Sequence, residues 1–342
     1  MTLEEVKEAL EELALRFGDR RIHHFHVEVA ELQDGTCQLA GSVLDDEALQ
    51  ALRTTLAQRF PNLDVHLEQV RVLRRPGASR MTVATNLTNL KGEPASGSET
   101  LSQLVAGWTV EPLLEQEKWL LVRQDDGYLG WLFAPYLAEQ LPAPPTHFVC
   151  KPVALLSAEP LPDAPLVTRL VAGTPVTCRQ LQDSWACVEV SSSTAGWLAG
   201  SALRALDALP AGFSERRAQM ARDAQGYVGV PYLWGGVSAL GIDCSGFVQL
   251  LHRLSGMTIP RDADMQWHAG APVEPPFAPG DLLFFGSGQG HRRISHVGMS
   301  LGGWRMIHSS GPRNGVYVDD VQAADWLHDI FVGARTFLND AG

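Results

Sequence analysis

The sequence predicts a multidomain α+β protein with a small α/β module, two copies of a small β domain and a larger α+β domain. Helical and alternating apolar patterns are mixed within residues 1–76, as expected for an α/β module. Residues 81–141 and 147–207 repeat one another and show short β patterns with few helical signals. Residues 212–338 combine helical stripes with strand patterns and contain the most reactive side chains. The 342 residues are enough for several such domains.

Composition and charge exclude some classes of partner. The formal net charge of −12 argues against non-specific binding to nucleic acid or to anionic lipid. No stretch of about 18 uncharged apolar residues occurs, so no membrane span is expected. The N-terminus lacks the basic start and the apolar run of a secretory signal, which predicts a cytoplasmic protein. If the sequence is a trimmed form, an extracellular or cell-wall location stays open.

The pattern of the first module predicts the order helix, strand, strand, helix, strand. A turn at Asp34-Gly35 joins the first two strands, a helix follows over about Asp46–Arg59, and a last strand runs over Val65–Leu73. The turn, the strand after it and this helix together resemble a BON-type α/β module. The Pro/Gly-containing stretch at 76–79 predicts a linker.

An internal repeat occupies the middle of the chain, at a constant offset of 66 residues and without a gap. Its short strands, with a tryptophan near the third and Gly-Trp closing the fourth, resemble the bacterial SH3-like domain, a small β-barrel. Tyr128 of the first copy corresponds to Thr194 of the second, so the barrel itself does not require an aromatic side chain there. The matching segments are Leu104-Val105-Ala106-Gly107 with Leu170-Val171-Ala172-Gly173, Trp119 with Trp185, Val122 with Val188, Gly130-Trp131 with Gly196-Trp197, and Leu137 with Leu203.

Cys244 is one of five cysteines, an odd number without a C-x-x-C pair, so neither a metal site nor a dithiol site is expected. It stands where a helix with a core-facing apolar stripe is predicted to begin. A thiol in the first helical turn lies beside unpaired N–H groups and the positive end of the helix dipole. That position favours the nucleophilic thiolate and could stabilise an oxyanion on a substrate. The alternative is that Cys244 only packs and Asp243 only caps the helix.

Two histidines provide the partner that Cys244 needs. Residues 294–299 predict a strand, and 304–308 predict its return after a tight turn. If the hairpin is centred on Gly302, His296 and His308 are direct cross-strand neighbours, with Cβ atoms about 5 Å apart. One imidazole could then take the proton of Cys244 while the other orients it. Two histidines on one face could also be half of a zinc site, but neither H-E-x-x-H nor C-x-x-C is present.

Short motifs in a specific order distinguish the C-terminal domain. They are Pro231-Tyr232-Leu233-Trp234-Gly235-Gly236, Asp243-Cys244-Ser245-Gly246-Phe247, Pro260-Arg261, Gly280-Asp281-Leu282 and Ser295-His296-Val297-Gly298. Together they resemble the NlpC-type (NlpC/p60) family of papain-like cell-wall peptidases. The resemblance implies a papain-like α+β fold and cleavage of peptidoglycan stem peptides, most often after γ-D-glutamate. It also implies that Cys244 and His296 form the catalytic pair, with His308 as the third polar residue and no cofactor.

Tandem SH3-like domains ahead of this domain make the chain similar to γ-D-glutamyl-L-diamino acid endopeptidases that process released murein peptides. In those enzymes the first SH3-like domain helps to enclose the site, so that only a free N-terminal L-Ala-γ-D-Glu fits. Acidic and hydroxyl groups hold its α-amine. Ala263 departs from the family, which often has a hydroxyl residue there, and the N-terminal module lies outside the usual pattern. The positions that the resemblance implies for substrate binding are Tyr128, Tyr232, Asp243, Ser245 and Asp262, with Arg261 beside them.

The expected function is therefore that of a cysteine endopeptidase acting on peptidoglycan-derived peptides, in murein peptide recycling. Three alternatives stay open. A related amidase or acyltransferase could use the same Cys/His chemistry on another acyl group. A secreted wall hydrolase could use the SH3-like pair to bind polymer, and a non-catalytic binding protein could retain the same side chains.

Overall fold

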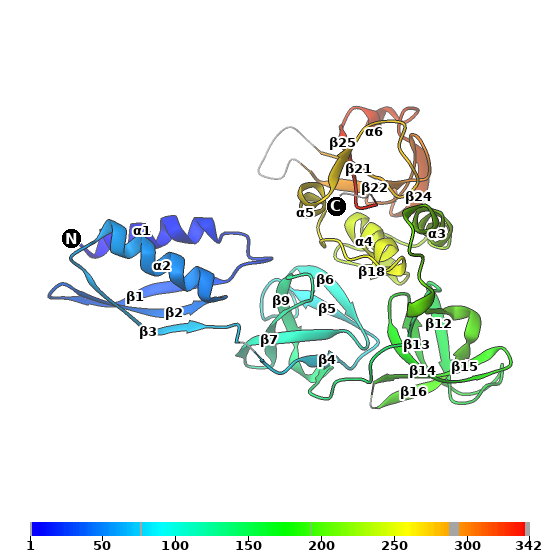
Figure 1. Ribbon diagram of the computed structural model, residues 1–342, viewed down its shortest axis with the longest axis horizontal. Coiled ribbons are helices and arrows are strands. Elements are labelled where there is room, and N and C mark those ends of the chain that lie inside the picture. Colours follow the sequence, from blue (N-terminus) through cyan, green and yellow to red (C-terminus); the bar gives the residue numbers. More distant parts are fainter. Residues whose placement is uncertain (1, 76, 192, 287–293, 339–342) are drawn as a thin grey trace.

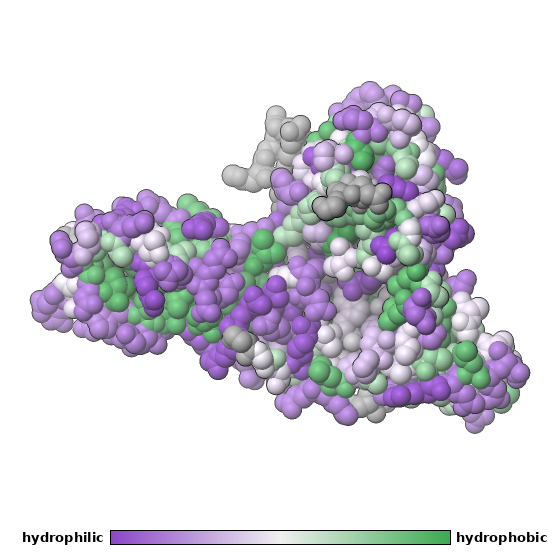
Figure 2. Space-filling view, in the orientation of Figure 1, coloured by the Kyte–Doolittle hydropathy of each residue, from purple (hydrophilic) through white to green (hydrophobic). Residues whose placement is uncertain are grey.

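The computed structural model describes residues 2–75, 77–191, 193–286 and 294–338; Pro76, in the predicted linker, lies outside these ranges. Figure 1 shows the N-terminal module (blue) as an arm beside the first β domain (cyan), and the C-terminal domain (yellow to red) above the two β domains. Figure 2 shows hydrophilic side chains on all the domains of this face, with hydrophobic ones between them. Within the described residues, no helix is long and apolar enough to cross a membrane. The predicted α+β multidomain architecture is confirmed.

The N-terminal module has the predicted order of elements. They are α1 (Leu3–Arg16), β1 (Phe25–Gln33), β2 (Thr36–Val43), α2 (Asp46–Arg59) and β3 (Asp64–Val72). The sheet order is β1-β2-β3, with β1 antiparallel and β3 parallel to β2. Both helices pack their apolar stripes on this sheet and enclose a core of the module's own.

The two β domains have corresponding strands in the same sheet order. The first contains β4 (Met81–Val83), β5 (Leu87–Lys91), β6 (Thr100–Val105), β7 (Thr109–Gln116), β8 (Trp119–Arg123), β9 (Leu129–Phe133) and β10 (Leu137–Ala138). The second contains β11 (His147–Val149), β12 (Val153–Ser157), β13 (Leu166–Val171), β14 (Pro175–Gln182), β15 (Trp185–Ser191), β16 (Thr194–Ala199) and β17 (Leu203–Ala205). Their orders are β10-β4-β7-β8-β9-β5-β6 and, in the opposite direction, β17-β11-β14-β15-β16-β12-β13. The internal repeat is therefore also a repeat of topology.

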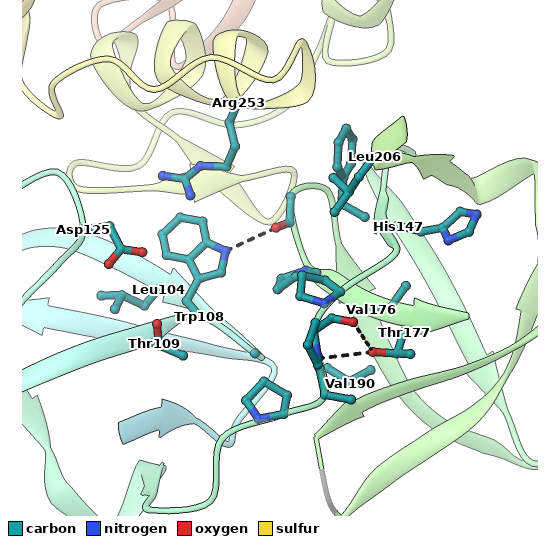
Figure 3. A pocket seen from close by; sticks show the side chains of 18 of the residues that line it. Leu104, Trp108, Thr109, Asp125, His147, Val176, Thr177, Val190, Leu206 and Arg253 are labelled. Carbon is teal, nitrogen blue, oxygen red and sulfur yellow. Dashed lines mark hydrogen bonds between the residues drawn. The ribbon is translucent and has the colours of Figure 1, made fainter. Parts of the chain in front are cut away.

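Trp108 joins the two β domains to the C-terminal domain. Its indole Nε1 donates a hydrogen bond of 3.2 Å to the carbonyl oxygen of Gly173 in the second β domain. The guanidinium of Arg253, from the C-terminal domain, lies over the indole at 3.9 Å from the ring centroid (Figure 3). A cation over an aromatic face is attracted by the ring's electrons, and burial strengthens this attraction. The contact is one of several that join the first β domain to the C-terminal domain.

A six-stranded sheet and the helix that begins at Cys244 form the centre of the C-terminal domain. The helices are α3 (Phe213–Gln225), α4 (Cys244–Leu254), α5 (Ala263–Ala269) and α6 (Asp325–His328). The strands are β18 (Val237–Ser238), β19 (Gly241–Ile242), β20 (Ala271–Val273), β21 (Leu282–Phe285), β22 (His296–Ser300), β23 (Arg305–Ser310), β24 (Gly315–Asp320) and β25 (Phe331–Thr336). The sheet order is β20-β25-β21-β22-β23-β24, with β18 and β19 as a separate pair. Helix α4 packs against β22 and β23, which brings Cys244 to the strands that bear the histidines.

The predicted register of the β22–β23 hairpin is wrong by two residues. Met299 pairs with Ile307, so the hairpin is centred on Gly303 and not on Gly302. Trp304 belongs to the loop and not to the return strand. Both glycines have positive φ, of 119° and 59°, which L side chains rarely adopt, and this requirement sets the loop. The shift by an even number keeps side chains on their predicted faces, because the side-chain period of a strand is two.

His252 on α4 couples the stability of this domain to pH. Its Nδ1 donates a hydrogen bond of 2.7 Å to the carbonyl oxygen of Val248, so the neutral ring carries its proton there. Its Nε2 is buried and has no hydrogen-bond partner among the described residues. Burial lowers the pKa of His252 to about 4. As pH falls below the usual histidine value, the unfolded chain therefore takes up this proton before the folded chain does.

Between about pH 7 and pH 5, this difference is expected to cost roughly 2 kcal/mol in the free energy of unfolding. Replacing His252 by phenylalanine should reduce that loss, because the phenyl ring has nothing to protonate. Urea unfolding at both pH values measures it, with the exposed His268→Ala as the matched control. An equal loss of stability in His252→Phe and the parent chain would contradict the explanation.

Candidate active site

Cys244 is the first residue of α4 and its side chain faces the sheet. It is 8% exposed. Asp243 caps the helix, with its Oδ1 accepting a hydrogen bond of 2.7 Å from the backbone N–H of Gly246. A Cβ at Gly246 would lie 2.3 Å from the carbonyl oxygen of Gly236, so only glycine fits where the helix start approaches this loop. The motif around Cys244 thus places the thiol at the helix start and the loop against it.

Arg261 holds this cap from behind the pocket. Its Nη2 donates to Oδ2 of Asp243 at 2.7 Å and its Nη1 to Oδ1 at 3.1 Å, with both side chains buried. Nη1 also binds the hydroxyl of Ser245 at 2.8 Å, and Nε binds the hydroxyl of Ser102 in the first β domain at 2.9 Å. Arg261 does not line the pocket, which corrects its expected place among the substrate-binding residues. Its guanidinium binds the carboxylate of Asp243 that caps α4, and is therefore not available to a substrate.

His296, His308 and Asp319 form a relay across three neighbouring strands. Nε2 of His296 lies 2.7 Å from Nδ1 of His308, and Nε2 of His308 lies 2.9 Å from Oδ2 of Asp319. A carboxylate only accepts, so His308 donates from Nε2 and accepts at Nδ1. His296 then donates from Nε2, which leaves its Nδ1 as the basic nitrogen. The relay therefore sets which nitrogen of His296 can take a proton.

The sequence prediction found the two histidines but missed Asp319. His308 pairs with Tyr317 across β23 and β24, so Asp319 is its diagonal neighbour on the same face. Arg313 also donates to Asp319, at 2.6 and 2.7 Å to its two oxygens. Hydrogen bonds from His308 and Arg313 lower the pKa of Asp319 against the effect of its partial burial, which raises it. A carboxylate on the strand that follows the predicted return strand was the available signal.

Gly298 allows the two rings to meet. A Cβ there would lie 2.3 Å from the sulfur of Met306 and 2.9 Å from Cβ of His308. In the observed register Gly298 lies opposite His308. His296 is therefore a diagonal neighbour of His308 and not its direct partner. The ring centroids are 4.9 Å apart.

Burial opposes the ionisation of both members of the expected pair. It raises the pKa of Cys244 to about 12, with a smaller contribution from the charge of Asp243. It lowers the pKa of His296 to about 3, with a further contribution from His308. Hydrogen bonds from the backbone of Val297 and Ser245 favour the thiolate but are outweighed. The expected thiolate is therefore not favoured in the empty pocket, because desolvation outweighs the helix terminus.

A pocket of about 240 Å³ contains the thiol and draws its walls from three parts of the chain. Tyr128 of the first β domain reaches it, and its hydroxyl donates to Oδ2 of Asp262 at 2.9 Å. Arg21 of the N-terminal module, which the sequence analysis did not single out, is also in the wall. The side chains around the pocket include Glu99, Tyr232, Trp234, Asp243, Ser245 and Asp264.

The expected substrate-binding residues divide into two groups. Tyr128, Tyr232 and Asp262 line the pocket and offer hydroxyl or carboxylate groups to it. Asp243 and Ser245 also line it, but both of their side chains are engaged in the network around Arg261. Burial, together with the nearby thiol and Asp243, raises the pKa of Tyr232, so this phenol stays protonated. The first group presents polar atoms to the pocket, and the second supports the helix start.

A larger cavity, of about 520 Å³, lies where the two β domains meet the C-terminal domain (Figure 3). It is lined by Trp108, Arg253 and the proline-rich connection between the β domains. It includes neither Cys244 nor His296. Within the part of the chain that the structure describes, no group of three or more His, Cys, Asp or Glu side chains is arranged to hold a metal ion.

Comparison with known families agrees with this geometry. Residues 229–335 match the NlpC/P60 family, and residues 85–138 match the bacterial SH3 domain. The chain carries an NlpC/P60 domain and a bacterial SH3 domain. This confirms the resemblance drawn from the motifs around Cys244 and His296. The second β domain repeats the topology of the first, which is the matched one.

Relatives of the NlpC/P60 domain include peptidases. A γ-D-glutamyl-L-lysine dipeptidyl-peptidase of Bacillus subtilis (strain 168) is 41% identical over 105 residues, 30% of this chain and 34% of that protein. Dipeptidyl-peptidase 6 of Lysinibacillus sphaericus is 28% identical over 266 residues, 73% of this chain and 93% of that protein. The first match thus spans about a third of its relative's length.

A solved structure shares the fold over most of the chain. The crystal structure of an NlpC/P60 family protein from Bacillus cereus ATCC 10987 superposes with a TM-score of 0.65 at 22% identity. The match covers 76% of this chain and 100% of that one. The similarity in fold between the two proteins therefore extends beyond the NlpC/P60 domain to the parts of the chain that precede it.

Proposed function

We propose that this protein is a cysteine endopeptidase that hydrolyses the γ-D-glutamyl-L-diamino acid bond of peptidoglycan stem peptides with a free N-terminal L-alanine. The observation that carries the proposal is one pocket that holds Cys244 together with the Tyr128–Asp262 pair. A nucleophile and a carboxylate site in one pocket suit a peptide cut a fixed distance from its amino end. The γ-D-glutamyl-L-lysine dipeptidyl-peptidase relatives support the same bond type.

The relay provides the chemistry in two half-reactions. Nδ1 of His296 takes the proton of Cys244 as the sulfur attacks the γ-glutamyl carbonyl carbon. The free N–H groups at the start of α4 stabilise the resulting oxyanion. The histidine returns its proton to the leaving amine, and a γ-glutamyl thioester remains on Cys244. Water activated by His296 then hydrolyses the thioester and restores the thiol.

Proton transfer within the site agrees with the neutral resting forms of Cys244 and His296. His308 accepts from His296 and donates to Asp319, so the imidazolium that forms on His296 lies at one end of a chain ending in a carboxylate. That arrangement stabilises the positive charge only when it develops, which is the useful moment for catalysis.

The amine end of the substrate is assigned to Tyr128, Asp262 and Glu99. The Tyr128 hydroxyl donates a hydrogen bond to Asp262, so its oxygen is available to accept one from an ammonium group. Glu99 lines the same pocket and accepts a hydrogen bond of 2.9 Å from Nε1 of Trp234. An ammonium group removed from water needs such acceptors, and a carboxylate among them. This end of the pocket therefore favours a free amine over an amide.

The test is to incubate the protein with L-Ala-γ-D-Glu-diaminopimelate and with its N-acetylated form, and to measure release of the diamino acid. Cleavage of the free-amine peptide alone is the expected result and supports a role in recycling released wall peptides. Cleavage of both peptides would contradict the amine requirement and indicate a wall hydrolase with an open site. Cleavage of neither would contradict the proposed bond and favour an amidase or acyltransferase.

A further inference from the structure

Arg21 brings the N-terminal module into the pocket that contains Cys244. It lies in the loop between α1 and β1, and its side chain is 13% exposed. Its carbonyl oxygen accepts a hydrogen bond of 2.7 Å from the backbone N–H of Leu129, at the start of β9. The loop is thus anchored to the first β domain next to Tyr128. Arg21 therefore enters the pocket from a fixed backbone position.

All five N–H groups of the Arg21 guanidinium donate to carboxylates. Nε and Nη2 bind the two oxygens of Asp19, in the same loop, at 2.8 and 2.7 Å. Nη1 binds Oδ2 of Asp262 at 2.7 Å and Oδ1 of Asp264 at 2.8 Å, and Nη2 binds Oδ2 of Asp264 at 2.8 Å. A substrate anion would have to break one of these pairs to bind Arg21. The guanidinium is thus a fixed wall of the pocket and not a displaceable plug.

Three carboxylates surround the guanidinium of Arg21. They belong to Asp19, Asp262 and Asp264. Burial by itself would lower the pKa of Arg21, but its hydrogen bonds to Asp19, Asp264 and Asp262 raise it well above its usual value. Arg21 is therefore charged at any pH at which the protein is folded.

Arg21 also decides how Asp262 faces the pocket. Asp262 precedes α5 but makes no side-chain capping bond to that helix. Its Oδ2 is taken by both Arg21 and Tyr128, whereas its Oδ1 has no hydrogen-bond partner among the described residues. Both oxygens of Asp264 are taken by Arg21. The guanidinium thus leaves one carboxylate oxygen of this pair open, beside the Tyr128 hydroxyl.

We propose that Arg21 is a specificity-determining residue, through which the N-terminal module limits the pocket to peptides with a single unblocked ammonium at their amino end. The inference rests on the proposed function and assigns a role in it to the N-terminal module. Arg21 occupies Asp264, orients Asp262 and closes the pocket where a longer or acylated chain would extend. Without Arg21, Asp262 loses the hydrogen bond that orients it, and the wall of the pocket is open.

The test compares Arg21→Met with Arg20→Met, which changes an exposed neighbour in the same loop. The kcat and KM values are measured for L-Ala-γ-D-Glu-diaminopimelate and its N-acetylated form. For Arg21→Met, we expect KM for the free-amine peptide to rise about tenfold with kcat changed less than about threefold. The preference for the free amine over the acetylated peptide should fall by a similar factor. Arg20→Met should match the parent protein in both respects.

Arg21→Lys is a second variant that keeps the proposal testable if Arg21→Met does not fold. Lysine keeps the charge but not the planar fork that binds two carboxylates at once. Its preference for the free amine should therefore lie between those of the parent and Arg21→Met. Unchanged preference in either variant would overturn the proposal. Increased turnover of both peptides would also overturn it, because that result would show that Arg21 blocks the pocket and inhibits the enzyme.

Protection of Cys244 from iodoacetamide separates this inference from the proposed function. The dipeptide L-Ala-γ-D-Glu and its N-acetylated form are the protecting ligands, and no turnover is required. We expect the free-amine form to protect the parent protein at about tenfold lower concentration than it protects Arg21→Met. Cleavage of neither peptide by the parent contradicts the proposed function alone. Equal protection of the parent and Arg21→Met contradicts the role of Arg21.

Discussion

Replacing Cys244 by alanine is expected to lower hydrolysis of L-Ala-γ-D-Glu-diaminopimelate by at least about a thousandfold, because Cys244 is the only thiol among the described residues that line the pocket. His296→Ala should have a comparable effect, since the buried thiol then loses the base that takes its proton. Release of the diamino acid at saturating peptide measures both. Substantial residual turnover in either variant, with intact folding, would contradict the assignment of Cys244 as nucleophile and His296 as base.

Asp319→Asn extends the same series and tests the direction of the relay. An amide can donate to Nε2 of His308, which reverses the tautomer of that ring and then that of His296. Nδ1 of His296 would carry a proton and could not act as the base. A loss of about a hundredfold in kcat, with KM little changed, is expected.

The control for this series is Cys150→Ala, which removes a partly buried thiol from the second β domain. It should leave turnover within about twofold of the parent, as expected for a cysteine with no part in the chemistry. Thermal unfolding of each variant shows whether a loss of turnover reflects chemistry or folding. A large loss of turnover in Cys150→Ala would show that the assay follows stability.

Arg261→Met should cause the largest loss of stability, about 3–5 kcal/mol in the free energy of unfolding. The substitution leaves the buried carboxylate of Asp243 without its counterion, with only the hydrogen bonds of Ser245 and two backbone N–H groups. It also removes the bond between Nε and Ser102, which ties the NlpC/P60 domain to the first β domain. Urea unfolding at neutral pH measures the change.

Arg179→Met is the matched control, because Arg179 pairs with Glu189 at 2.7 Å in an exposed position on the second β domain. Its loss should be below about 1 kcal/mol, since solvent screens an exposed ion pair. Similar losses for Arg261→Met and Arg179→Met would show that the buried pair does not hold the start of α4. The comparison also separates a buried charge from a simple change of surface charge.

Local patterns in the sequence were sufficient for the elements of the N-terminal module, for the start of α4 and for two of the three members of the relay. The turn at Asp34-Gly35 and the helix over Asp46–Arg59 depend on residues close together in the chain, so their signals are local. The start of α4 at Cys244 is signalled by Asp243 and the apolar stripe that follows. His296 and His308 lie on the two predicted strands of one hairpin. The register was wrong by two residues, and an even shift leaves both side chains on the predicted face.

Contacts between distant segments decided the rest. Asp319 joins the relay because its strand pairs with the strand that bears His308. Arg261 lies outside the pocket because its guanidinium binds the buried carboxylate of Asp243. Burial raises the pKa of Cys244, which no local helix signal can report. Arg21 meets Asp262 across 241 positions of sequence. The sequence by itself determined which side chains could do chemistry, because that depends on residue type and local period. Only the tertiary structure decided their charges, partners and exposure, because these depend on what the fold packs around them.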